Sequence, residues 1–314
     1  MSYLPDHYAA RRTRERDRRR RARARRRIAA AGLVVAAALA VALVTPIGTT
    51  SRTPSPQRAP AAATALGPLP ARLTAAHALD AREERVVRRL IALGLPVYCG
   101  GHHGREVALT FDDGPGVYTH YAVRKLAAAH ERATFFVVGK SIVAWPGWLR
   151  RELRVAVLGD HTWHHLDLDA LAPAQVYDEI ESARALIERD TRLPVFLFRP
   201  PYGAHDAVVD ATVRRLDMID VLWSVDSADS LGANYAGIIH NVAVGLRPGA
   251  IIEMHENRGQ TIRALTTLLP LLHRRHLRSV SVLQLLADDP PTTAQLRAGE
   301  PGCGRTASLA QGVE

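Results

Sequence analysis

From residue 97 onward, short apolar runs alternate with stretches of helical periodicity. Short apolar runs bounded by turn residues are typical of buried strands, and strands that alternate with helices form a parallel sheet. The strand-like runs cover residues 107–111, 134–138, 155–158, 195–198, 219–223, 250–254 and 279–282, and clear helical stretches cover 172–189 and 261–276. This pattern predicts one α/β domain over residues 97–304. Its length of about 200 residues is short for a complete eight-fold barrel but sufficient for a single core.

Two pairs of residues in this domain have the chemistry of a metal site. Asp112 and Asp113 end the run at 107–111, and a Gly-Pro pair at 114–115 then forces a turn. His161 and His165 are four residues apart, which on a helical turn places both imidazoles on one face, within reach of one ion. Asp113 could supply a third ligand, so the sequence indicates a mononuclear metal site.

Polar residues also follow several other apolar runs. Arg-Pro-Pro-Tyr-Gly occupies residues 199–203, Trp-Ser-Val-Asp occupies 223–226, and His255 follows the run at 250–254. The carboxyl ends of parallel strands are where α/β enzymes place their chemistry. We therefore expect these residues to surround the metal site.

With these motifs the chain resembles the polysaccharide deacetylases of carbohydrate esterase family four, whose domain is also called the NodB-homology domain. The resemblance covers residues 97–287 and includes all five family motifs in the family's order: T-F-D-D-G-P at 110–115, H-T-x-x-H at 161–165, R-P-P-Y-G at 199–203, W-x-x-D at 223–226, and the strand-borne His255. It implies a distorted (β/α)7 barrel with the site at its C-terminal mouth.

The resemblance also implies a role for each motif residue. The implied metal ligands are Asp113, His161 and His165, which excludes His164 as a competing ligand. The implied proton-transfer and orienting groups are Asp112 as general base, Arg199 to orient it, the backbone N–H of Tyr202 facing the oxyanion, His255 as general acid, and Asp226 to tune His255.

The chemistry of these residue types points to a hydrolase independently of the family. Three protein ligands leave positions on a zinc-like ion for water and a substrate carbonyl oxygen, and such an ion lowers the pKa of its water toward ~7. We expect one divalent ion, zinc, cobalt or another, and removal of N-acetyl groups from a polysaccharide such as cell-wall peptidoglycan or a chitin-like glycan. An O-acetyl esterase and a catalytically weak sugar-binding module remain alternatives.

Two positions depart from the family pattern. Ser230 follows Asp229, the second Asp of the fourth motif, at a position where the family commonly has a Trp. Glu253 stands where a Leu usually lies two residues before the acid histidine. On a strand, residues two apart share a face, so Glu253 should point the same way as His255. We expect the carboxylate to pair with protonated His255 or a nearby arginine; a polar acetyl pocket is the alternative.

The positive charge of the chain is concentrated before this domain. Residues 1–27 carry 12 arginines against three acids, or +9 of the net +10, while the remainder has 29 basic and 28 acidic residues. Basicity confined to a tail excludes a folded nucleic-acid-binding domain. The tail is followed by 17 residues at 28–44 that are apolar apart from Gly32.

This order of charge and apolar run predicts a membrane anchor. The positive-inside rule keeps residues 1–27 in the cytoplasm and sends the rest outward, so we expect a single-pass signal anchor at 28–44; a cleaved signal with a secreted product is the alternative. Residues 45–70 are typical of an extended linker, and 71–96 of an N-terminal helix that Gly94 ends. Residues 305–314 form a C-terminal tail.

The chain has two cysteines, Cys99 and Cys303, which bracket the predicted domain. Spacing alone allows two buried thiols. The outward topology favours a disulfide between them.

Overall fold

The computed structural model describes residues 79–304. The expected cytoplasmic tail, anchor, linker, first part of the N-terminal helix and C-terminal tail lie outside the described residues, and those predictions remain untested. Within 79–304, none of the helices combines the length and apolar character that a membrane crossing requires.

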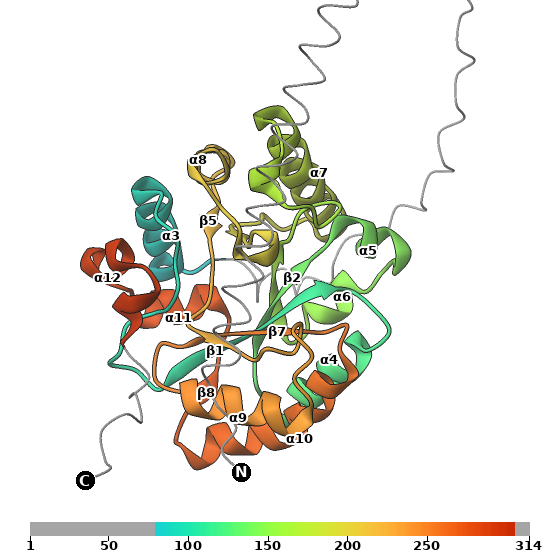
Figure 1. The fold of residues 1–314 in the computed structure, drawn as a ribbon, viewed down its shortest axis with the longest axis vertical. Helices are drawn as coiled ribbons and strands as arrows, with labels where there is room; N and C mark the ends of the chain where they lie inside the picture. Colours follow the sequence, from blue (N-terminus) through green and yellow to red (C-terminus); the bar gives the residue numbers. More distant parts are fainter. Residues whose placement is uncertain (1–78, 305–314) are drawn as a thin grey trace, which may run out of the picture. The chain divides into compact units, whose positions relative to one another are not determined.

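A curved, wholly parallel sheet forms the centre of the fold, and helices flank it (Figure 1). The strand order is β5-β4-β3-β2-β1-β7-β6, and β8 pairs with the beginning of β1. The strands are β1 Glu106–Gly114, β2 Ala133–Val137, β3 Ala156–Asp160, β4 Leu197–Phe198, β5 Ile219–Asp220, β6 Val225–Asp226, β7 Ile251–His255 and β8 Arg278–Ser279. This arrangement fits the distorted β/α barrel expected from the sequence.

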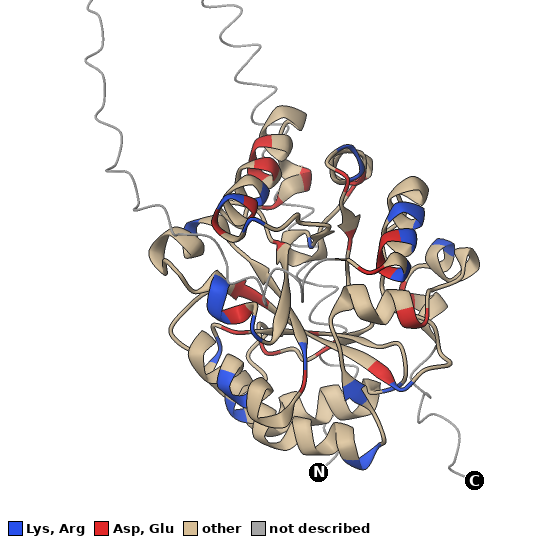
Figure 2. Ribbon diagram, turned by 180° about the vertical axis from the view of Figure 1, so that it is seen from behind, with Lys and Arg blue, Asp and Glu red and all other residues tan. Residues whose placement is uncertain are grey.

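Helix α3 precedes the first strand, and most of the other helices connect successive strands. The helices are α3 Ala81–Leu93, α4 Thr119–Ala129, α5 Gly139–Ala144, α6 Leu149–Glu152, α7 Pro173–Thr191, α8 Ala207–Arg215, α9 Tyr235–Gly245, α10 Gly259–Arg274, α11 Val282–Asp288 and α12 Thr293–Ala298, with 3-10 turns η1 Leu168–Ala170, η2 Pro201–Gly203 and η3 Glu300–Cys303. The ribbon in Figure 2 is coloured blue at basic and red at acidic residues, and both colours alternate along α3 and α7, so the charge on these helices is mixed in sign.

The expected strands are present, with shifted ends. The run at 279–282 differs most, because β8 ends at Ser279 and Ser281 already caps α11 by accepting a hydrogen bond from the Gln284 N–H. A serine before apolar residues is a strong helix-start signal, and here it prevails over strand propensity.

Helix α3 has defined limits that the sequence partly predicts. The Asp80 side chain accepts hydrogen bonds from the N–H groups of Arg82 and Glu83, and Gly94 ends the helix with a left-handed φ of 60°. Val86, Val87 and Leu90 are its buried residues and belong to the same core cluster as α11 and the strands. The expected stop at Gly94 is thus confirmed.

The two ends of the domain are joined covalently. Cys99 and Cys303 form a disulfide with their Cα atoms 5.8 Å apart, as the sequence favoured. The Gly100 N–H also donates to the Gly249 carbonyl, and the Gly101 N–H to that of Asp289. The segment before β1 is therefore fixed to the C-terminal part of the domain.

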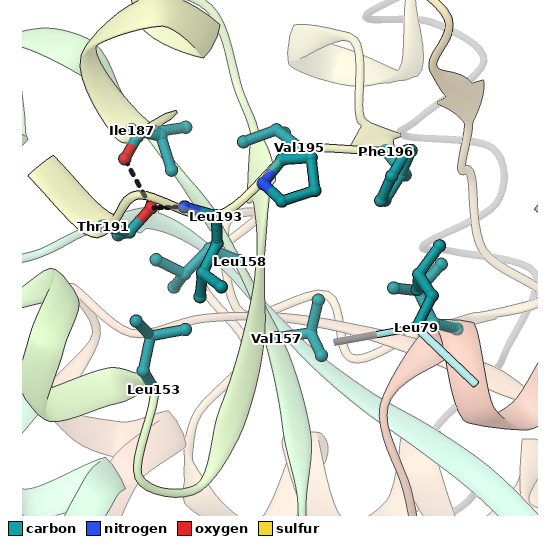
Figure 3. Close-up of a pocket in the computed structure, with 11 residues that line it drawn as sticks. Leu79, Leu153, Val157, Leu158, Ile187, Thr191, Leu193, Val195 and Phe196 are labelled. Atoms are coloured by element: carbon teal, nitrogen blue, oxygen red, sulfur yellow. Dashed lines mark hydrogen bonds between the residues drawn. The ribbon is translucent and has the colours of Figure 1, made fainter. Parts of the chain in front are cut away.

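A small cavity of about 30 Å³ lies beside β3 and the end of α7 (Figure 3). Its lining is apolar apart from Thr191, whose hydroxyl donates to the Ile187 carbonyl and accepts from the Leu193 N–H. Since its one hydroxyl is already engaged, the cavity is a packing gap, and the polar chemistry lies elsewhere.

Candidate metal and acid–base site

The carboxyl ends of the strands bring the five sequence motifs to one edge of the sheet. Asp112 of β1 is in register with His255 of β7. On the other side of β1, Val137 of β2 is in register with Asp160 of β3, which in turn pairs with Phe198 of β4. His161 and Arg199 therefore emerge at the same level as the two aspartates.

A β-bulge turns both aspartates of β1 toward this edge. In a regular strand consecutive side chains point to opposite faces. The register of β1 with β2 shifts between Asp112 and Gly114, and Asp113 has a left-handed φ of 74°. Asp112 Oδ2 and Asp113 Oδ1 consequently lie 4.0 Å and 3.7 Å from Nε2 of His161.

Residues 161–165 form a loop, so the helical turn expected there is wrong. Thr162 and His165 have left-handed φ values of 68° and 60°. The Asp160 side chain accepts a hydrogen bond from the Thr162 N–H, and Thr162 Oγ1 accepts one from the His165 N–H. These local side-chain hydrogen bonds replace those of the expected helical turn, and the resulting loop brings the imidazoles of His161 and His165 together.

Asp113, His161 and His165 have the geometry of a metal-ligand set. Asp113 Oδ1 lies 3.2 Å from Nε2 of His165 and 3.7 Å from Nε2 of His161. Ligand atoms 2.0–2.1 Å from a tetrahedral ion are about 3.3 Å apart, which these distances bracket. The donor set of two nitrogens and one oxygen therefore fits one zinc-type ion.

The protonation of these residues suits metal binding. Burial lowers the pKa of His161 and of His165 to about 4 each, so both rings are neutral near pH 7. Burial raises the pKa of Asp113, but interactions with His255, His161 and His165 outweigh it, and the pKa lies below its ordinary value. All three groups thus present lone pairs to a cation.

Hydrogen bonds also orient the ligands. The Nδ1–H of His161 donates to the Arg199 carbonyl at 2.7 Å, which leaves Nε2 for a metal. The ring of Tyr202 packs edge-on against that of His165, with centroids 4.7 Å apart. His164 is directed elsewhere, because its Nδ1 lies 2.6 Å from Glu179.

Arg199 is fully buried and holds Asp112. Its Nη1 donates to Asp112 Oδ1 and to Thr110 Oγ1, both at 2.7 Å. Burial raises the pKa of Asp112, and the adjacent guanidinium opposes that rise. One carboxylate oxygen of Asp112 is thereby held by Arg199, while the other faces His161.

His255 is held by Asp229 rather than by Asp226, which corrects the expectation from the sequence. Its Nδ1 lies 2.7 Å from Asp229 Oδ1, and its backbone N–H donates to Asp229 Oδ2. The carboxylate of Asp226 instead accepts a hydrogen bond from the Ala228 N–H. Asp226 closes the turn that leads to Asp229, so it supports the partner of His255.

Glu253 lies against the other nitrogen of His255, as expected. Glu253 Oε1 is 3.4 Å from His255 Nε2, and both side chains are buried. Burial lowers the pKa of His255, but Glu253 and Asp229 outweigh it and raise this pKa well above its ordinary value. Burial in turn raises the pKa of Glu253. Ser230, the other unusual residue, is exposed.

Three supporting residues were missed from the sequence. Asn257 donates to Asp113 Oδ2 at 3.0 Å, and the Thr261 hydroxyl donates to Asp229 Oδ2. Asp229 itself lies three residues after Asp226, a repeat of acids that could have indicated it. Asn257 and Thr261 carry no such signal, because their roles depend on where the chain turns after β7.

The fold and site together define an α/β protein with a histidine–aspartate ligand cluster at the carboxyl edge of a curved parallel sheet. The family model for polysaccharide deacetylase matches residues 100–220. A chitooligosaccharide deacetylase of Bradyrhizobium sp. (strain ANU 289) is 35% identical over 189 residues, which cover 54% of this chain and 86% of the relative. The chain belongs to the polysaccharide deacetylase family.

Two further similarities concern other members of this family. The peptidoglycan-N-acetylglucosamine deacetylase PgdA of Listeria monocytogenes (serotype 1/2a, strain 10403S) is 32% identical over 187 residues, covering 59% of this chain and 39% of that protein. The structure of a carbohydrate esterase family four pseudoenzyme from Bacillus anthracis superposes with a TM-score of 0.56 at 25% identity, covering 61% of this chain and 68% of that one.

Proposed function

We propose that this protein is a metal-dependent hydrolase that removes N-acetyl groups from a polysaccharide of N-acetylated sugars. The observation that carries the proposal is one constellation at the sheet edge. The ligand set of Asp113, His161 and His165 lies beside two proton-transfer groups, since Asp112 is 4.0 Å from His161 and His255 is 4.0 Å from Asp113.

Asp112 is the proposed general base. A divalent ion bound by the ligand set would lower the pKa of a water molecule and polarise the acetyl carbonyl. Asp112 would accept a proton from the attacking water through Oδ2, because Arg199 engages Oδ1 and fixes the orientation of the carboxylate. The Tyr202 backbone N–H is the proposed donor to the oxyanion that develops on the carbonyl oxygen.

His255 is the proposed general acid. Its Nδ1 is held by Asp229, so Nε2 carries the proton that passes to the leaving nitrogen. The raised pKa keeps the ring protonated near neutral pH. An amine leaves only after protonation, whereas an alcohol leaves more readily, so an acid that is protonated near neutral pH favours N-deacetylation over the alternative O-acetyl ester hydrolysis.

The proposed substrate and location rest on the related proteins and on the membrane topology expected from the sequence. Relatives that act on chitooligosaccharides and on peptidoglycan support an N-acetylglucosamine polymer as substrate. The arginine-rich flank and apolar run at 28–44 favour a single-pass anchor with the domain outside the membrane, which makes peptidoglycan the first candidate. Recovery of most of the protein in the medium, starting beyond residue 44, would instead establish a cleaved signal.

The test is acetate release by the zinc-loaded protein from chitooligosaccharides, peptidoglycan and acetylated xylan. We expect release from at least one N-acetylated glycan, and in His161→Ala the loss of activity together with the ion held by this ligand set. His164→Ala is the matched control, since it removes a neighbouring imidazole that lies outside the ligand set. Release from xylan alone would identify an O-acetyl esterase, and binding to one of these glycans without release from any would identify a sugar-binding module.

A further inference from the structure

A second cluster of metal-binding side chains lies outside the site described above. His205 follows η2, Asp210 lies on α8, and Asp220 ends β5. His205 Nδ1 is 2.9 Å from Asp210 Oδ1 and 4.0 Å from Asp220 Oδ2. Three elements that are separate in the sequence therefore direct one nitrogen and two carboxylates toward a common point.

Asp220 is the member of this cluster whose buried carboxylate is not stabilised by hydrogen bonds. Its side chain is 5% exposed, and neither carboxylate oxygen has a hydrogen-bond partner among residues 79–304. Burial without hydrogen bonds raises the pKa of Asp220 to about 7, because it disfavours the charged carboxylate, and a cation or metal ion beside the carboxylate would stabilise that charged form. Asp220 Oδ2 is directed toward His205, which marks this point as the place for a positive charge.

The surrounding groups do not supply that charge in full. Protonated His205 offers one positive charge against Asp210 and Asp220, and Asp206 adds a third acid while it caps α8. The guanidinium of Arg199 also interacts with Asp220, but its hydrogen bonds go to the Asp112 and Thr110 side chains and to main-chain carbonyls of residues 221 and 222. The cluster thus has an excess of negative charge.

We propose that His205, Asp210 and Asp220 form a second binding site for a divalent, zinc-type ion. One ligand atom from each residue lies within 4.8 Å of the other two. The two distances to His205 bracket the separation of about 3.3 Å around a tetrahedral ion, as do those of the first cluster. An imidazole nitrogen with two carboxylate oxygens is a donor set that zinc accepts, and the ion supplies the charge that Asp220 lacks.

This second ion would act on the loop that follows the Arg-Pro-Pro-Tyr-Gly motif. Tyr202 and Gly203 have left-handed φ values of 64° and 61°, and that conformation is costly for a tyrosine. His205 lies two residues beyond them, while Asp220 belongs to the sheet. An ion bridging the two ties the end of this loop to β5, and so has a structural role.

The test measures zinc bound by the full-length chain, with the first cluster disabled by His161→Ala. We expect this variant to retain about one ion per chain after dialysis, and the double variant His161→Ala, Asp220→Asn to retain far less than one. Asp217→Asn in the same background is the control, because it removes an exposed acid three residues away. Wild type should bind one more ion than His161→Ala.

Thermal unfolding provides a second measurement that does not depend on catalysis. Zinc should raise the Tm of His161→Ala and of its Asp217→Asn control, and leave that of the Asp220→Asn double variant unchanged. Asn has nearly the shape of Asp, so the double variant should fold. Equal zinc content and an equal rise in Tm with and without Asp220 would overturn the second site. Failure of the catalytic proposal would not affect this comparison, since it is made without the first cluster.

Discussion

Glu253 tests the proposed mechanism most directly, because its carboxylate lies beside the nitrogen of His255 that would donate a proton. Two full charges at their separation of 3.4 Å attract by about 5 kcal/mol at an effective dielectric constant of about 20. This figure is an upper bound, since burial raises the pKa of Glu253 and reduces its charge. A fraction of it is enough to alter the proton affinity of His255.

Replacement Glu253→Gln should therefore move the basic limb of the pH–rate profile to lower pH. The protonated ring is the active form, and its folded pKa is raised, so activity is lost as pH rises through that pKa. Removing the carboxylate lowers the pKa, and we expect the limb to shift by at least about one pH unit, equivalent to 1.36 kcal/mol. The assay is kcat/KM for acetate release across the pH range.

Metal content should stay unchanged in this variant, because Glu253 lies outside the ligand set of Asp113, His161 and His165. An unshifted basic limb together with faster turnover would refute the pairing. It would indicate instead that Glu253 makes the acetyl pocket polar and that the natural substrate carries something other than a simple acetyl group.

Three other perturbations have defined outcomes. Chelation should abolish acetate release and zinc should restore it; full activity at undetectable metal content would contradict the proposed chemistry. Arg199→Met leaves the buried carboxylate of Asp112 unpaired, so unfolding by denaturant should show a loss of about 3–5 kcal/mol, whereas a loss below 1 kcal/mol would mean that the pair contributes little. Cys99→Ser frees the ends of the domain and should lower stability by about 2–5 kcal/mol, with a peptide map of the wild type showing Cys99 and Cys303 linked under non-reducing conditions.

The alternation of apolar runs was sufficient to predict the parallel sheet and the edge that bears the motifs. Asp112, Asp113 and His161 lie together because each directly follows or ends a strand whose position the periodicity marks. Local spacing was less informative. The four-residue interval between His161 and His165 suggested a helix, but Asp160 and Thr162 form hydrogen bonds to nearby main-chain N–H groups and stabilise a loop.

Side-chain partners that lie on different strands or loops could not be predicted from the local sequence pattern. The choice between Asp226 and Asp229 as partner of His255 depends on a turn after β6, and both acids stand at plausible distances along the chain. Glu253 was different, because a strand's two-residue period fixes its direction relative to His255. Side-chain direction was thus predictable within one strand, and the contacts between loops required the structure.

The disulfide between Cys99 and Cys303 has a consequence for the chain as a polymer. It joins the segment before β1 to η3, so the domain is topologically a ring that spans 204 residues of sequence. The link lies near the start of β1, whereas the carboxylates of Asp112 and Asp113 lie near its other end, roughly 20 Å away at about 3.3 Å per residue of strand. A peptide linker could replace the disulfide, and the ring could then be opened at an exposed loop. Such a circular permutant should retain the active edge, because the strands that form it keep their neighbours.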